Sequence, residues 1–228
     1  MILSFFYTGG ESEGIPMKTT NKLEQELKSK LGDRYDVEIY SPASIARNIA
    51  EIAHKNQKRL NGEPYVTHPN RMANMFNNLI MWGDPEGYDC ELLFNLGIPD
   101  KGVVSVCYLH DVIEDTKYKF EDIKTIYQKE KWLSIFFEEN IANPLKLITH
   151  KKSEPYSKYI EKVCSEPVSA MVKFLDLVDN LNPFGLDELG EYEFRRMQKY
   201  VKYIRVINDK YHFIERFNKY RRLINYPW

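Results

Sequence analysis

Apolar and polar positions alternate with helical spacing along most of the chain. Near the start, Leu23, Leu27 and Leu31 recur behind Asn21, which together with Glu24 resembles a capping box. The pattern therefore predicts an amphipathic helix here.

The same spacing predicts further helices as far as the C-terminal region. Ser41-Pro42 offers an N-cap and a first-turn proline, and Pro99 and Pro167 suit first-turn positions. The predicted helices cover residues 41–58, 70–81, 91–96, 99–116, 120–129, 132–139, 143–148, 156–164, 168–181, 191–208 and 211–224, with loops over 60–69 and 83–87. Residues 35–40 alternate weakly, which leaves room for a short strand. We expect an all-α fold, a bundle of roughly ten helices.

Length and composition favour one domain. The chain has 228 residues and no Gly/Ser/Pro-rich linker. Residues 1–16 combine a short apolar start with a loop-like stretch, and Met17 could be an alternative start. We therefore expect a flexible N-terminal extension over 1–16 and a domain over 17–228. The start lacks a basic leader, so we do not expect a signal peptide.

Charge and cysteine content narrow the range of partners. The formal net charge is -1 and the basic residues are spread along the chain, which argues against nucleic-acid binding. The three cysteines form no CxxC pair, which argues against a disulfide framework and a Cys-rich zinc site. No apolar run approaches the roughly 20 residues of a membrane span. We expect a cytoplasmic protein.

The segment from His110 to Asp115 is the densest group of candidate catalytic side chains. It contains His110, Asp111, Glu114 and Asp115 and follows a mostly apolar stretch. On a continuous helix, all four side chains would crowd one side. Burying them is costly unless a cation compensates. Imidazole and carboxylate together suit a divalent metal, so the segment predicts a metal site.

Two other segments could complete this site. His68 ends a constrained loop, although a solvent-exposed helix cap is the better explanation of a His-Pro pair taken alone. Asp176 and Asn180 share a helix face, although a surface carboxylate is the simpler interpretation of Asp176 taken alone. Asp179 would take the place of Asp176 if the helix register were shifted.

Three segments resemble the RelA/SpoT-type (p)ppGpp hydrolases. Residues 54–69 resemble the HxGQxRxxGEPYxxHP signature, residues 108–116 look like the LLHDVIEDT segment, and residues 173–180 are similar to the KLADxxxN segment. They occur in the family's order. Because no synthetase domain follows, the chain resembles the single-domain small alarmone hydrolases, also called MESH1-like, within the HD superfamily.

The resemblance implies a single HD-type helical bundle and a set of site residues. A divalent metal, usually manganese, would be held by His68, His110, Asp111 and Asp176. Glu114 and Asp115 would orient or activate the attacking water. Nucleotide contacts would come from Arg59, Asn180, Arg196 and Tyr200, and from a loop lysine for which Lys151 or Lys152 is the candidate. The implied reaction removes pyrophosphate from the 3′ position of a guanosine tetra- or pentaphosphate, a small-molecule nucleotide.

The chain also departs from the family pattern. Leu60 stands where the family has a basic residue after the arginine, and Asn56 and Leu175 replace a glycine and an alanine. Losing a cation beside Arg59 weakens phosphate recognition. This favours another nucleotide, such as a dinucleotide cofactor phosphate or an adenosine alarmone, as the alternative substrate. A second alternative is an antitoxin or regulatory module that binds a partner through the aromatic, basic tail 200–228.

Overall fold

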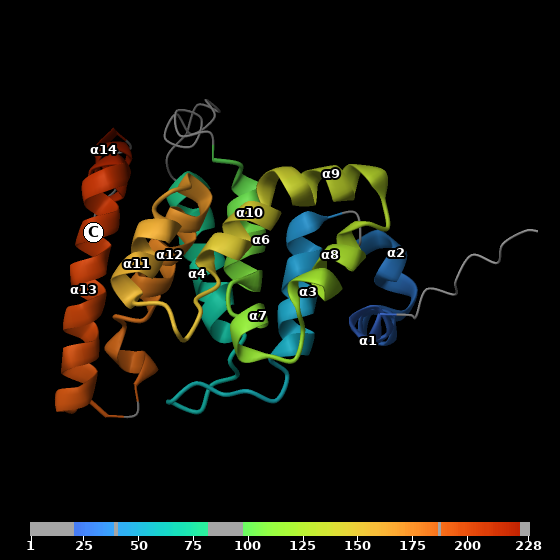
Figure 1. Cartoon of the computed structure of the whole chain (residues 1–228), viewed down its shortest axis with the longest axis horizontal. Helices are drawn as coiled ribbons and strands as arrows, with labels where there is room; N and C mark the ends of the chain where they lie inside the picture. Colours follow the sequence, from blue (N-terminus) through green and yellow to red (C-terminus); the bar gives the residue numbers. More distant parts are fainter. Residues whose placement is uncertain (1–20, 39–40, 82–97, 187, 224–228) are drawn as a thin grey trace, which may run out of the picture.

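The computed structural model describes residues 21–38, 41–81, 98–186 and 188–223, and this part of the chain is built from helices (Figure 1). The all-α prediction is confirmed. Within the described residues, the only extended pairing is an isolated antiparallel bridge between Lys58 and Pro64. The strand predicted over 35–40 is wrong where it can be compared, because residues 35–38 form a helical turn. The predicted loop 83–87 and helix 91–96 lie outside the described residues.

The elements follow one another as α1 (Lys22–Leu31), η1 (Gly32–Arg34), α2 (Tyr35–Glu38), α3 (Pro42–Ala53), α4 (Thr67–Met81), α6 (Asp100–Leu109), α7 (Val112–Asp115), α8 (Phe120–Tyr127), α9 (Lys131–Asn140), α10 (Ala142–Ile148), α11 (Tyr156–Val163), α12 (Pro167–Asp179), η2 (Pro183–Gly185), α13 (Glu191–Tyr211) and α14 (Phe213–Leu223).

Helix α3 ends earlier than its predicted end at residue 58, because the following backbone pairs with the loop that returns to α4. The Arg59 N–H donates to the Glu63 carbonyl at 2.8 Å, and the Tyr65 N–H donates to the Gln57 carbonyl at 3.0 Å. These bonds replace the helical ones. They hold residues 57–65 as a compact loop directly before His68.

The central helix, predicted as continuous over 99–116, breaks into α6 and α7. The His110 Nδ1–H donates to the Cys107 carbonyl at 2.8 Å. In a continuing helix, that carbonyl would accept the Asp111 N–H. The imidazole competes with the backbone for the acceptor, so the helix breaks at the residues expected to bind metal.

Helix α6 is the centre of the bundle. It packs against α3, α4 and α12, while α13 packs on α12 and forms the left edge of the molecule in Figure 1. The start of α4 and the end of α6 lie at the lower end of this view, where α7 also lies. Helix α12 contacts both α4 and α6, so residues far apart in the sequence meet at this end.

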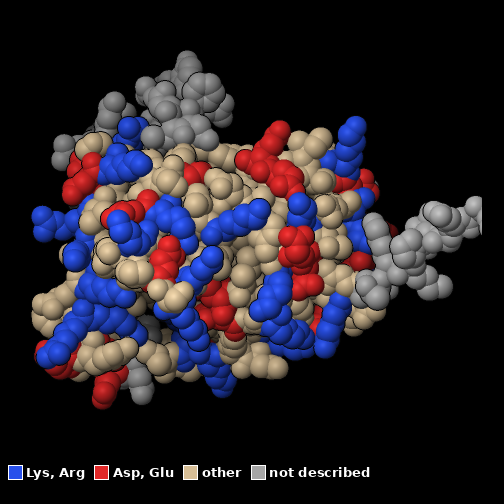
Figure 2. Space-filling view, viewed as in Figure 1, with Lys and Arg blue, Asp and Glu red and all other residues tan. Residues whose placement is uncertain are grey.

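One cluster of buried apolar side chains runs from α1 to α14, including Leu23, Ile49, Phe76, Leu109 and Phe213. The domain limits themselves, 1–16 and 17–228, stay a prediction, since residues 1–20 lie outside the described part. Over the face in Figure 2, Lys and Arg are interspersed with Asp and Glu. Among the described helices, none is long and apolar enough to cross a membrane.

Candidate metal centre and substrate pocket

Three of the four predicted metal ligands form one buried cluster. His68 stands in the first turn of α4, His110 follows α6, and Asp176 lies on α12. One ligand atom from each lies within 4.8 Å of the others. Their exposed fractions are 1%, 3% and 5%. Two imidazole nitrogens and a carboxylate are a donor set that suits a divalent transition metal.

The two imidazoles present the same nitrogen to the cluster. Their Nδ1 atoms are engaged elsewhere, with Cys107 in the case of His110 and with Asp179 in the case of His68. The His110 Nε2 is buried and has no hydrogen-bond partner. An unpaired buried nitrogen is costly. A bound metal would remove that cost, so these residues fit the ion that the resemblance implies.

Asp111, the fourth predicted ligand, borders the cluster. Its Oδ2 lies 2.9 Å from the His110 Nε2, without hydrogen-bond alignment, and 4.0 Å from the His68 Nε2. The Tyr65 hydroxyl donates a short hydrogen bond to the same oxygen. Tyr65 thus aims the carboxylate toward the two histidines.

Electrostatic coupling between His110 and Asp111 is strong. Burial alone would lower the pKa of His110, but the Asp111 and Asp176 carboxylates raise this pKa to about 9. Burial alone would raise the pKa of Asp111, but the charge of His110 holds this pKa far below its usual value. The pocket is therefore electronegative and favours a cation.

Asp176 is held from both sides. Its Oδ2 accepts from Lys173 at 2.7 Å, and its Oδ1 accepts from the Asn180 amide at 2.5 Å and lies 3.2 Å from the His68 Nε2. Burial opposes its ionisation, but the charge of Lys173 outweighs this and keeps the Asp176 pKa well below its usual value. Asp179 binds the opposite side of the His68 ring, so Asp176 is the better candidate ligand.

Glu114 and Asp115 lie on α7, at the exposed edge of the cluster. The Glu114 Oε1 accepts from the His150 backbone N–H at 2.6 Å. Burial and the nearby Asp111 carboxylate raise the pKa values of both Glu114 and Asp115. Both groups are thus more basic than ordinary carboxylates.

A pocket of about 260 Å³ opens near the cluster and contains most of the predicted nucleotide contacts. Its lining residues are Lys58, Arg59, Leu60, Tyr65, Asn180, Asn182, Leu186 and Arg196. The Arg59 Nη2 donates to the Asn180 Oδ1 at 3.0 Å. Since Asn180 also binds Asp176, it connects the pocket with the cluster. The Arg196 Nε is buried without a partner and leaves a donor for an anionic ligand.

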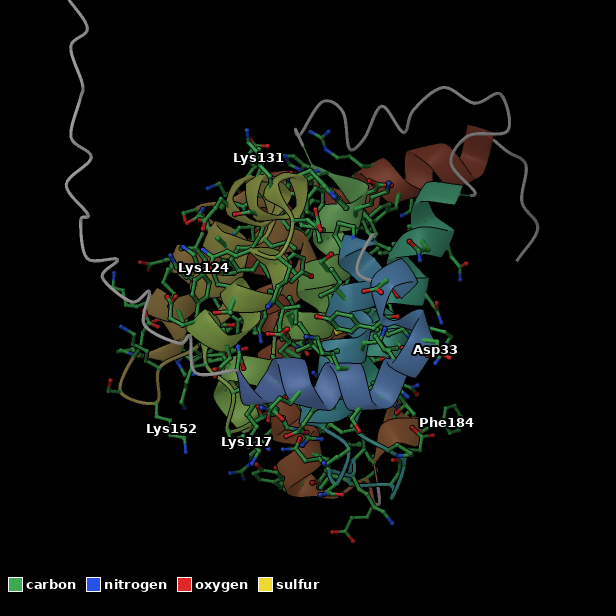
Figure 3. All side chains as sticks on the ribbon, turned by 90° about the vertical axis from the view of Figure 1, so that its right-hand side faces the viewer. Asp33, Lys117, Lys124, Lys131, Lys152 and Phe184 are labelled. Atoms are coloured by element: carbon green, nitrogen blue, oxygen red, sulfur yellow. The ribbon has the colours of Figure 1, made fainter. Side chains whose placement is uncertain are left out.

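Two predicted contacts lie outside this lining. Tyr200, one turn beyond Arg196 on α13, is half-buried against the core. Lys151 is exposed in the loop that begins with His150, next to Glu114. The alternative, Lys152, points outward from the body in Figure 3. The structure thus places Lys151 beside the α7 edge and Tyr200 against the core, outside the pocket lining.

The sequence interpretation missed several partners. Tyr65 orients Asp111, and Lys173 neutralises Asp176; both lie inside the quoted motifs, but motif spacing does not reveal their partners. Lys58 adds a cation to the pocket. His54 supports Tyr65: its ring stacks on Tyr65 at 4.5 Å, and its Nδ1 lies 2.6 Å from the Gln57 Oε1.

The fold and the site together define a class: an all-α protein with a buried cluster able to hold a metal, beside a cationic pocket. No protein-family model matches the chain. Individual relatives, however, are similar over most of its length.

A probable guanosine-3′,5′-bis(diphosphate) 3′-pyrophosphohydrolase of Mycoplasma genitalium is 26% identical over 193 residues, which is 80% of this chain and 23% of the relative. The guanosine-3′,5′-bis(diphosphate) 3′-pyrophosphohydrolase MESH1 of Xenopus tropicalis is 26% identical over 69% of this chain and 78% of the relative. The chain spans about a quarter of the Mycoplasma genitalium protein and most of the Xenopus one. The resemblance predicted from the motifs is confirmed.

A solved structure supports the fold. It is that of a metazoan SpoT orthologue that hydrolyses ppGpp, and it superposes with a TM-score of 0.52 at 19% identity. The superposition covers 80% of this chain and 95% of the other. At this identity the match concerns the helical fold alone.

Proposed function

We propose that the chain is a metal-dependent phosphohydrolase that removes the 3′ pyrophosphate from guanosine 3′,5′-bis(diphosphate)-type alarmones. The observation that carries this is the buried cluster of His68, His110 and Asp176 beside a pocket lined by Arg59 and Arg196. The names of the relatives support the substrate.

The metal would be held by His68, His110, Asp111 and Asp176, and manganese is the proposed ion. A bound divalent ion lowers the pKa of water and polarises a phosphoryl oxygen. Mixed nitrogen and oxygen donors accept manganese as well as other first-row metals. The choice of ion is therefore a proposal that a metal titration can test.

Glu114 and Asp115 act on the attacking water in this proposal. Their raised pKa values suit a general base, because each carboxylate accepts a proton more readily than an exposed one. The His150 N–H fixes one Glu114 oxygen at 2.6 Å, which orients the other. The carboxylate accepts a proton from the attacking water as the water oxygen bonds to the phosphorus attached to the ribose 3′ oxygen. The bond between that phosphorus and the 3′ oxygen breaks, the 3′ oxygen takes up a proton to restore the hydroxyl, and GDP and pyrophosphate separate.

Pocket residues recognise the nucleotide. Arg59 and Arg196 pair with phosphate oxygens, since guanidinium forms two parallel hydrogen bonds with such groups. Lys151 approaches from the loop beside α7, and Asn180 and Tyr200 hold the sugar and base. A cytoplasmic location and the absence of nucleic-acid and membrane partners belong to the same proposal.

Leu60 bears on the choice of nucleotide. It lines the pocket and is 61% exposed, at the position where the family carries a basic residue. Lys58 lines the same pocket and brings a third cation to it. If Lys58 supplies the positive charge that the family has at position 60, the protein should hydrolyse ppGpp faster than a dinucleotide cofactor phosphate or an adenosine alarmone. Hydrolysis rates across these three nucleotides test this.

The testing experiment is manganese-dependent hydrolysis of ppGpp, with the products separated by chromatography. We expect equal amounts of GDP and pyrophosphate, and we expect Asp111→Ala to abolish both turnover and manganese binding. Asp33→Ala is the matched control, because Asp33 is exposed on η1, an element that contributes no residue to the cluster, and it lies at the edge of the view in Figure 3. An active Asp111→Ala protein without bound metal would overturn the assignment.

A further inference from the structure

We propose that Asp179, held by Arg71, is the positioning residue of the metal centre: it sets the tautomer and the ring orientation of His68. This inference rests on the metal site of the proposed function. It concerns a carboxylate outside the predicted ligand set, on the far side of the His68 ring from the cluster.

The contact between Asp179 and His68 is short, and both side chains are buried. The Asp179 Oδ2 lies 2.7 Å from the His68 Nδ1, and the two side chains are only 3% and 1% exposed. A carboxylate accepts but does not donate. The His68 Nδ1 must therefore carry the proton, which leaves the Nε2 lone pair free to face Asp176 and the metal.

Arg71 fixes the Asp179 carboxylate in turn. Its Nε donates to the Asp179 Oδ1 at 2.7 Å, and its Nη2 donates to the Oδ2 at 3.1 Å. This two-pronged pairing holds the plane of the carboxylate and neutralises its charge. Both oxygens are thereby directed, one of them toward the His68 ring.

Arg71 also connects Asp179 with Glu63, an exposed residue of the loop before α4. The Arg71 Nη1 donates to the Glu63 Oε2 at 3.1 Å, and the Thr67 hydroxyl donates to the same oxygen at 3.2 Å. Thr67 directly precedes His68. The loop backbone and the His68 side chain are therefore held by one connected set of bonds.

The two histidines of the cluster are oriented by different groups. His110 donates from Nδ1 to the neutral Cys107 carbonyl, whereas His68 donates to the charged Asp179. A partner on the far ring nitrogen fixes the tautomer and orientation of a ligating imidazole, and loss of such a partner typically costs about 10- to 100-fold in metal affinity. The charged Asp179, itself fixed by Arg71, therefore sets the direction in which His68 presents its Nε2.

A purely structural role is the competing explanation. Asp179 and Arg71 also join α12 to α4, and any buried ion pair that joins two helices contributes to stability. Metal affinity distinguishes the two roles, because a structural pair affects unfolding without affecting the affinity of the folded protein.

The experiment is a calorimetric titration of the metal-free protein with Mn²⁺, without nucleotide, at constant pH. We expect Asp179→Ala to weaken Mn²⁺ binding about 10- to 100-fold. Asp179→Asn keeps an acceptor for the His68 Nδ1–H but loses the charge, so we expect a smaller loss, about three- to tenfold. Glu24→Gln is the matched control: Glu24 is also buried and paired with two lysines, but lies on α1.

A second readout follows the tautomer directly. With ¹⁵N-labelled histidine, we expect the wild-type His68 to carry its proton on Nδ1, and we expect the Nε2-protonated fraction to rise in Asp179→Ala. If Asp179→Ala does not fold, the Asp179→Asn titration decides.

Wild-type Mn²⁺ affinity in a folded Asp179→Asn protein, or an affinity loss in Glu24→Gln equal to that in the Asp179 variants, would overturn the inference. Failure of the wild type to hydrolyse ppGpp, with a weakened Mn²⁺ affinity still seen in the Asp179 variants, would contradict the proposed substrate and leave the positioning role supported.

Discussion

The ion pair with Lys173 keeps the Asp176 carboxylate ionised inside the bundle. It donates to the Asp176 Oδ2 at 2.7 Å, and the side chains are 13% and 7% exposed. A buried charge without such a partner costs several kcal/mol, on the order of 3 to 5 when one member of a pair is removed. Asp176 is therefore charged and ready to face a metal with its other oxygen.

Arg196 offers a prediction at the same scale. Arg196→Met removes from the pocket a guanidinium whose Nε is buried without a partner, and it keeps most of the side-chain volume. We expect kcat/KM for ppGpp to fall about 10- to 100-fold, because a charge-assisted hydrogen bond contributes roughly 1.5 to 3 kcal/mol. Steady-state kinetics measures this, and Mn²⁺ affinity should remain unchanged.

The neighbouring Arg195 provides the control. It pairs with Glu191 on the same helix, and both side chains are 73% exposed. Exposed pairs of this kind contribute little. Arg195→Met should change kcat/KM less than about twofold; an equal loss in both variants would count against a specific pocket role for Arg196.

At the scale of elements, helix α1 is tied to the bundle by a buried acid. Glu24 is only 6% exposed at its side chain, and it pairs with Lys28 at 2.8 Å and with Lys129 at 2.8 Å. Burial alone would raise the pKa of Glu24, but the two lysines outweigh it and lower this pKa. Lys129 follows α8, so the pair connects the first helix to the middle of the chain.

We expect Glu24→Gln to lower the free energy of unfolding at pH 7 by about 1 to 3 kcal/mol. Because the pKa of Glu24 is lower in the folded state, its ionised form stabilises the fold above its unfolded pKa. That contribution disappears as the pH falls through the folded value. The difference between wild type and variant should therefore shrink below about pH 4.5, as urea unfolding at pH 7 and pH 4 would measure.

The exposed Asp33 offers the comparison for this prediction. Asp33→Asn should leave stability nearly unchanged at both pH values, since surface changes without partners have small effects. A Glu24→Gln difference that is the same at both pH values would contradict the ionic explanation.

At the scale of the whole molecule, the metal centre joins three distant parts of the chain. Residues 68, 110 and 176 come from α4, from the end of α6 and from α12. An ion bound there cross-links helices that otherwise depend on apolar packing. Metal binding should therefore stabilise the folded state as a unit.

We expect Mn²⁺ to raise the melting temperature. At a free concentration about 100 times its Kd, the gain is about 2.7 kcal/mol, or about 5 to 10 °C for a chain of this size. Calorimetry with Mn²⁺ and with a chelator measures the shift. Asp176→Ala should show none, whereas the Asp33→Ala protein should respond as the wild type does; a full shift in Asp176→Ala would exclude this cluster as the binding site.

Much of the fold was predictable because helix signals are local. The N-caps at Asn21 and Ser41 and the proline that opens α12 at Pro167 appear where the pattern indicated. The break at His110 was not predictable from periodicity, since it depends on an imidazole taking the Cys107 carbonyl from the backbone. The loop over 60–69 was predicted, but the early end of α3 at Ala53 was not, because it depends on residues 57–65 bonding to one another through their backbone.

The sequence by itself determined the helical class, the residue types of the candidate metal site and their order, since periodicity and motif spacing are properties of the chain. Only the tertiary structure decided which nitrogen each histidine presents, that Asp179 lies behind His68, and that Asn180 links Arg59 to Asp176. The decisive relations join residues more than a hundred positions apart, His68 with Asp179 and Arg59 with Asn180. Packing of α4, α6 and α12 sets these distances, and no local spacing encodes them.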